Sequence, residues 1–291
     1  MTMPDMYSTP TGPAAGGTHA TTSSYAEPPQ SNVTRTTTSS IKRIFSIARA
    51  ETLLFVRNPT IALTALGLPL VMVVLLLPIG DSADGAAFSR FLVHTLAVWA
   101  LLLVVYVNLT TIFVSRREDG VFQRMSTGEA SPWEALIAAS LPPFAVVLAQ
   151  VIVGVAATLI LFDGAILTDP LLILVALIGT TVFLGGISAW TSRFTTTVEG
   201  AQYSTMPIMM LLIFASGTLL PTSVLPEQLA RLCEFTPLYT AAELLGLGMG
   251  SAEGGFLTAW TEAAQPLAVL AAWAVLGIIL AKRTMVFTRR R

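Results

Sequence analysis

Six long stretches of hydrophobic residues, separated by polar connections, dominate the chain after residue 59. A helix needs about 20 apolar residues to cross about 30 Å of hydrocarbon, and none of the six stretches contains Asp, Glu, Lys or Arg. The pattern therefore predicts an all-α membrane protein with six transmembrane helices in a domain over residues 59–282. These helices are expected at residues 60–79, 91–114, 136–162, 171–190, 201–220 and 265–281.

The sequence before the first span has two parts. Residues 1–40 are rich in Thr, Ser, Pro and Gly, and they offer too little apolar surface to offset the entropy of ordering. We expect a disordered tail, which serves either as an inert extension or as a docking segment. Apolar and basic residues then alternate with helical spacing, which predicts an amphipathic helix at 41–58 in the membrane surface.

The connection between the fifth and sixth spans, residues 221–264, is longer than the others and partly apolar. Its hydrophobic runs are too short to cross a bilayer, because Pro and Gly interrupt them. The pattern predicts two short helices that lie on the outer leaflet or dip into it as re-entrant helices.

The positive charges indicate the orientation. Fourteen of the 16 Lys and Arg residues lie on the side of the two termini, and only Arg90 and Arg231 lie opposite. Because cytoplasmic segments of membrane proteins carry the excess of Lys and Arg, we expect both termini in the cytoplasm, with residues 283–291 as a basic cytoplasmic end.

Composition excludes several classes of function. Hydrophobic residues make up 54% of the chain and charged residues 11%, against about 25% charged in soluble domains. The net charge of −1 gives no reason to expect a nucleic-acid partner. Its two histidines lie far apart, which makes a metal site improbable, and its single cysteine excludes an intrachain disulfide.

The chain also lacks the residues for an energy source of its own. Neither of its two lysines follows a glycine, so it has no Gly-Lys-Ser/Thr phosphate loop. Apart from His94, the spans contain no ionisable side chain that charges near neutral pH, which disfavours an ion-coupled carrier. We therefore expect no enzymatic activity in this chain.

The cytoplasmic connection between the second and third spans, residues 115–134, is densely charged. It ends in Ser131-Pro132-Trp133-Glu134, which is typical of a helix start: Ser caps, Pro fits the first position and Glu completes a capping box. From the pattern alone, the connection is either a solvated loop that follows the positive-inside rule or a docking site.

This connection resembles the cytoplasmic signature of ABC-2 type permeases, the membrane subunits of type V ABC exporters. The resemblance rests on Arg117-Glu118-Asp119-Gly120, Phe122, Arg124, Thr127 and Ser131-Pro132-Trp133; at Gly128-Glu129 many members of the family have a proline instead. It extends from about Lys42 to the C-terminus. It implies that the connection docks on a separate ATPase subunit, through Arg116, Arg117, Glu118, Asp119, Gly120, Phe122, Arg124, Ser131, Pro132, Trp133 and Glu134.

The resemblance has implications for two other segments. It implies that the long outer connection caps the translocation path, with Pro221, Pro226, Pro237 and Tyr239 in the re-entrant segment. In the fifth span, Met206, Met209, Met210 and Phe214 either fill the core or line a path for apolar cargo, since methionine adapts its shape.

The small residues of the fourth span, Gly179, Gly185, Gly186 and Ala189, allow a close approach of helices, either within the chain or in a dimer.

Together these features predict the permease subunit of an ATP-driven ABC exporter in the cell membrane, most consistent with a bacterial inner membrane. It would move a drug-like, lipidic or other amphipathic substrate outward, as in multidrug export. The expected partners are an ABC ATPase subunit, a second permease copy or homologue, and the lipid bilayer. This chain would bind no cofactor, because ATP and Mg belong to the ATPase subunit. The alternative is a membrane scaffold or assembly protein without a transport role.

Overall fold

The computed structural model describes five continuous parts of the chain. They are residues 85–118, 132–162, 166–218, 225–251 and 256–285, with isolated positions at Arg49, Gly67, Val71, Val74 and Leu75. The chain divides into two units, Met1–Thr37 and Thr38–Arg291, and all described residues lie in the second. The predicted tail, the amphipathic helix (apart from Arg49), most of the first span and residues 286–291 therefore lie outside the described residues.

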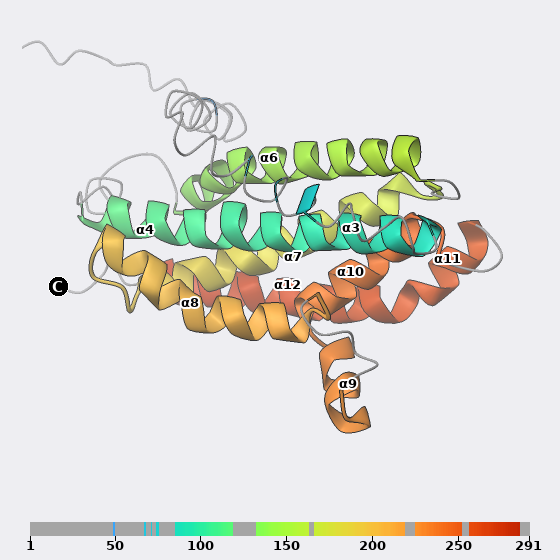
Figure 1. Cartoon of the computed structure of the whole chain (residues 1–291). Coiled ribbons are helices and arrows are strands. Elements are labelled where there is room, and N and C mark those ends of the chain that lie inside the picture. The colour runs from blue at the N-terminus through green and yellow to red at the C-terminus, as the bar shows by residue number, and fades with distance from the viewer. Residues whose placement is uncertain are drawn as a thin grey trace, which may run out of the picture. The chain divides into compact units, whose positions relative to one another are not determined.

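Helices make up the secondary structure of the described residues, as the sequence predicts, and the long ones run side by side with alternating direction (Figure 1). In chain order they are α3 (Gly85–Ala100), the π-helix η1 (Leu101–Val107), α4 (Asn108–Glu118), α6 (Pro132–Leu161), α7 (Pro170–Ser192), α8 (Val198–Ala215), α9 (Glu227–Glu234), α10 (Pro237–Gly248), α11 (Phe256–Glu262) and α12 (Ala264–Met285).

Four helical segments in the described residues are long and apolar enough to cross a membrane. They are Gly85–Glu118, Trp133–Leu161, Pro170–Ser192 and Ala264–Thr284, which match the predicted second, third, fourth and sixth spans. Gly85–Glu118 has 34 residues and is about 50 Å long at 1.5 Å per residue, so it extends beyond the hydrocarbon. The predicted fifth span corresponds to α8, which is not among these four.

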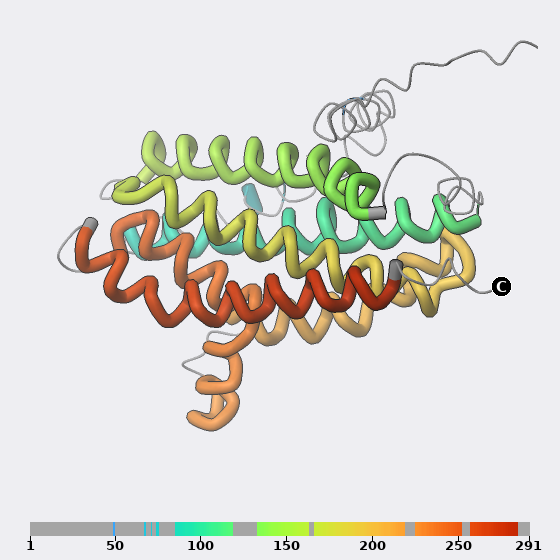
Figure 2. Tube along the Cα trace, turned by 180° about the vertical axis from the view of Figure 1, so that it is seen from behind, coloured from blue at the N-terminus to red at the C-terminus, as the bar shows by residue number. Residues whose placement is uncertain are grey.

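Helix α7 lies at the centre of the bundle, against α12, α10, η1 and α4 (Figure 2). Leu172, Leu177 and Leu184 of α7 are completely buried. A Cβ atom on Gly186 would overlap the carbonyl group of Gly277 in α12, and one on Gly179 would lie 2.8 Å from the Leu270 side chain. Glycines of the fourth span therefore serve close packing within one chain.

The long outer connection contains three short helices in its described part, where two were predicted. Helix α9 has no buried residue, whereas α10 is buried between α7, α12, α3 and α8. Backbone N–H groups of Thr168 and Asp169 each donate to the Gly248 carbonyl at 2.9 Å, and Thr236 Oγ1 donates to Ala215 O at 3.0 Å. These bonds fix both ends of α10 to the bundle.

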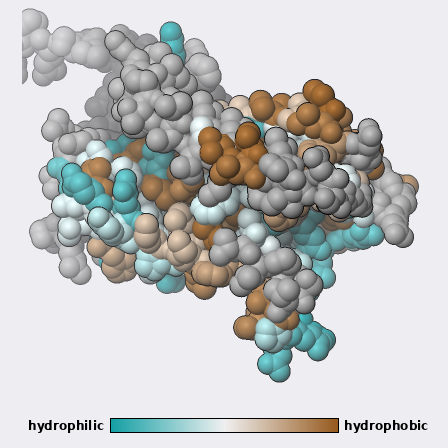
Figure 3. Space-filling model, in the orientation of Figure 1, coloured by the Kyte–Doolittle hydropathy of each residue, from teal (hydrophilic) through white to brown (hydrophobic). Residues whose placement is uncertain are grey.

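Much of the outer surface of the bundle is apolar. Ile152, Ile160 and Leu161 on α6 are between 59% and 83% exposed. Figure 3 shows apolar side chains over the outward face of α6, whereas α9 carries hydrophilic residues at its tip. An apolar perimeter of this kind is expected of helices that face lipid.

Candidate functional site

Apart from Arg90 on α3 and Arg231 on α9, the basic residues at the ends of the described long helices gather at one end of the bundle. We call this region the basic end; it contains Arg116 and Arg117 at the end of α4, Arg193 after α7, and Lys282 and Arg283 near the end of α12. The start of α6 also lies here, and Figure 1 shows the end on the left.

Arg117 joins α4 to the turn between α7 and α8. Its guanidinium donates to the carbonyl oxygens of Ser192 and Thr195. Carbonyls in the last turn of a helix lack intrahelical partners and form the negative end of the helix dipole. An arginine there donates hydrogen bonds to these carbonyls and also interacts favourably with the dipole. The Arg117 side chain is thus directed toward its own bundle.

The neighbouring arginine contacts a different helix. Arg116 Nη1 donates to Ala135 O, in the first turn of α6, at 3.4 Å. Residues 119–131 lie outside the described residues, but both of their flanks are described. Arg116 and Arg117 thus connect the end of α4 to α6 on one side and to the α7–α8 turn on the other.

The start of α6 agrees with the capping pattern. The helix begins at Pro132. Glu134 in its first turn is 8% exposed, and an acid is favoured there by the helix dipole. Lys282 Nζ lies 6.0 Å from the centre of the Trp133 ring, within cation–π distance. This contact links the start of α6 to the end of α12.

The predicted docking residues are only partly described. Glu118 is exposed at the end of α4, and Trp133 is half-buried. Asp119, Gly120, Phe122, Arg124 and Ser131 lie outside the described residues. Their docking role stays a prediction.

A polar contact between η1 and α7 was not predicted. Tyr106 is completely buried, and its hydroxyl lies 3.1 Å from Thr191 Oγ1. Ser188 Oγ donates to Tyr106 O at 3.1 Å, and Thr110 Oγ1 donates to the same carbonyl at 2.8 Å. We call Tyr106, Ser188 and Thr191 the polar seam. The signal that could have revealed it is the helical spacing of Ser188, inside the predicted fourth span, and Thr191, directly after it.

The outer prolines mark helix starts. Pro226 precedes α9 as its N-cap residue, and Pro237 is the first residue of α10, where a missing N–H costs nothing. Tyr239 lies half-buried in α10, and Pro221 lies outside the described residues.

The predicted path residues of α8 divide into two groups. Met209 is 9% exposed and belongs to the core, as one of the two interpretations expected. Met206, Met210 and Phe214 are between 43% and 50% exposed on the outward side of α8. Within a single chain these three do not line an enclosed path.

The model of one protein family matches the chain. This family is described as ABC-2 type transporter, and the match covers residues 42–248, more than two thirds of the chain. It includes α3 to α10 and the whole connection at 119–131. No curated protein matches the chain.

Proposed function

The chain belongs to the ABC-2 type transporter family, and on that basis we propose that it is the membrane-spanning permease subunit of an ATP-driven exporter. The observation that carries the proposal is the family match, which spans the charged connection at 119–131. Arg116 and Arg117, on the α4 flank of that connection, contact α6 and the end of α7, and these contacts support the same interpretation. Six spans, with both termini in the cytoplasm and the basic end facing the ATPase, complete the proposed architecture.

The proposed coupling starts at the connection. An ATPase subunit docks on residues 119–131, and closure of the ATPase dimer displaces the end of α4. Arg117 passes this displacement to the α7–α8 turn, and Arg116 passes it to α6. The bundle then moves between two arrangements whose populations the nucleotide state biases, because the docked ATPase binds them with different affinity.

We further propose that two copies, or this chain and a homologue, assemble along the outward face of α8. That face carries exposed apolar side chains at Tyr203, Met206, Met210, Leu211 and Phe214. A second copy would bury it and place the methionines between the subunits. Such an apolar lining suits drug-like, lipidic or other amphipathic cargo. The outer helices, with α10 as the re-entrant segment, would close the path on the outer side.

Reversing the charge of Glu118 tests docking. We expect Glu118→Arg to lower the amount of ATPase subunit that co-purifies with the full-length chain by about tenfold, since like charges across an interface cost several kcal/mol. Quantitative mass spectrometry of tagged complexes from native membranes measures the ratio. The matched control is Glu199→Arg on α8, an exposed acid in the turn region of the basic end and outside the connection. If the protein were a scaffold, no variant would co-purify with a stoichiometric amount of ATPase. An equal loss of ATPase in Glu118→Arg and Glu199→Arg would argue against docking at the connection.

Cys233 offers a test of orientation, because it is the only cysteine and lies on exposed α9. We expect a membrane-impermeant maleimide to label it in intact cells. In a Cys233→Ser background, Thr196→Cys in the exposed turn before α8 should react only after permeabilisation. The reverse pattern would overturn the proposed topology.

A further inference from the structure

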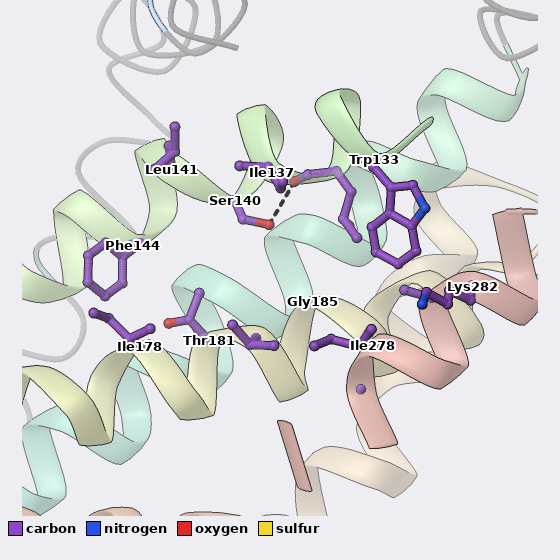
Figure 4. A pocket seen from close by; sticks show the side chains of 15 residues that line it. Trp133, Ile137, Ser140, Leu141, Phe144, Ile178, Thr181, Gly185, Ile278 and Lys282 are labelled. Carbon is purple, nitrogen blue, oxygen red and sulfur yellow. Dashed lines mark hydrogen bonds between the residues drawn. The ribbon is translucent and has the colours of Figure 1, made fainter. Parts of the chain in front are cut away.

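A groove opens on the outside of the bundle between α6, α7 and α12 (Figure 4). Its volume is about 650 Å³, within the range of about 300–1,000 Å³ that small-molecule sites occupy, so it is too large to be a packing defect. Its walls include Trp133 at the start of α6, but they include none of the α8 residues of the proposed dimer face.

The groove has a bare floor and apolar walls. Gly185, Gly186 and Gly277 contribute no side chain to its floor. Ile137 and Ile178 stand on opposite sides of it and are 46% and 45% exposed. In water such a surface would be costly, whereas an alkyl chain fits it.

The length of the groove corresponds to one leaflet. Its α6 wall runs from Trp133 to Phe144, about 16 Å at 1.5 Å per residue. This is about half of the 30 Å hydrocarbon thickness. The occupant therefore enters from one side of the membrane and reaches its middle.

The polar groups of the groove are placed as a lipid would require. Lys282 and Trp133 stand at the basic end, and basic and aromatic residues are the ones that anchor proteins at headgroup level. Among the described residues, no carboxylate forms an ion pair with Lys282. Its ammonium is therefore available to an anionic headgroup.

A buried hydroxyl lies deeper in the groove. Thr181 is 7% exposed, and within the described helices its Oγ1 has no hydrogen-bond partner. The preceding Thr180 instead donates to Ala176 O at 2.8 Å, as threonines in helices commonly do. A buried hydroxyl without a partner is costly. Thr181 lies about 15 Å from the level of Lys282, at the depth of the acyl chains.

We propose that this groove binds an anionic phospholipid of the leaflet at the basic end. The phosphate pairs with Lys282, and one acyl chain lies along Ile137 and Ile178. The bound lipid fills the space between α6 and α12 that no described side chain fills. This site requires neither the ATPase subunit nor a transported substrate.

The headgroup part of the proposal is tested with the full-length chain in detergent, titrated with phosphatidylglycerol or phosphatidylcholine and measured by native mass spectrometry. We expect phosphatidylglycerol to bind more tightly. Lys282→Gln should weaken its binding about fivefold, since a cation near a lipid surface contributes about that factor. Arg283→Gln is the matched control: the same charge is removed at the next position, but Arg283 does not line the groove.

The predicted binding of an acyl chain in the groove is tested by a substitution that fills the groove. Ile178→Trp should weaken the binding of both lipids, whereas Ile160→Trp, at an 83% exposed position of α6 outside the groove, should not. Equal losses with Lys282→Gln and Arg283→Gln would show diffuse attraction to surface charge and overturn the proposal. So would unchanged binding in Ile178→Trp, or equal affinity for the two lipids.

Discussion

Replacing Gly186 by alanine is expected to destabilise the protein by about 3 kcal/mol, the upper part of the usual range for overpacking. The added Cβ would overlap the backbone carbonyl of Gly277 rather than the end of a flexible side chain. Phe183 Cα and Val182 O of α7 lie within 2.9 Å of where a Cβ on Gly277 would stand, so the same contact is closed from the other side. To remove the overlap, α7 and α12 would have to separate at the centre of the bundle.

The adjacent glycine provides the control for this prediction. A Cβ on Gly185 would lie 3.6 Å from Ser140 Oγ and 3.9 Å from Leu109 Cδ1, which are ordinary contacts. We expect Gly185→Ala to change stability by less than about 1 kcal/mol. Heating detergent-solubilised protein and measuring the fraction that remains monodisperse should show a midpoint about 10 °C lower for Gly186→Ala. Equal midpoints for the two variants would contradict the packing of α7 on α12 described above.

Replacing Arg117 by glutamine is expected to lower the ATPase activity of the assembled complex about tenfold without releasing the ATPase subunit. Glutamine is shorter and uncharged, so we expect it to lose the charge-assisted bonds to Ser192 O and Thr195 O, and a displacement of α4 would no longer reach the α7–α8 turn. Hydrogen bonds to charged groups contribute about 1.5–3 kcal/mol, and about 1.4 kcal/mol corresponds to tenfold in rate.

Two measurements separate this effect from loss of docking. The ratio of ATPase to permease should stay at the wild-type value in Arg117→Gln, unlike in Glu118→Arg. Arg283→Gln removes a cation from the same end without touching these carbonyls, and it should leave ATPase activity unchanged. Wild-type activity in Arg117→Gln would exclude this arginine from coupling.

The membrane segments were predictable because length and absence of charge are properties of sequence alone. Four of the predicted spans correspond to described helices that are long and apolar enough to cross a membrane. The fifth was drawn too far toward the C-terminus: α8 ends at Ala215, and Gly217 has a φ of 75°, a left-handed conformation that stops helices. The polar residues Glu199 and Gln202 begin this helix, so its apolar part is short.

Other features depend on tertiary contacts that no local pattern encodes. Helix α10 is too short to span a bilayer, and no local pattern predicts that Leu238, Ala241 and Leu244 are buried among four other helices. Positive charge near a span end predicted a cytoplasmic face, but it could not predict that Arg116 and Arg117 contact different helices. The groove arises only where three helices meet.

The π-helix in the second span has a mechanical consequence. A π turn bonds residue i to i+5 and so contains one residue more than an α turn, and one residue corresponds to about 100° of rotation in an α-helix. The second span therefore changes neighbours along its length: α3 contacts α6 and α10, whereas α4 contacts α7 and α8 in addition to α6. Under the proposed coupling, rewinding at 101–107 would absorb axial strain that enters at the basic end. The hydrogen bonds of Tyr106 and Ser188 would then transmit it sideways to α7.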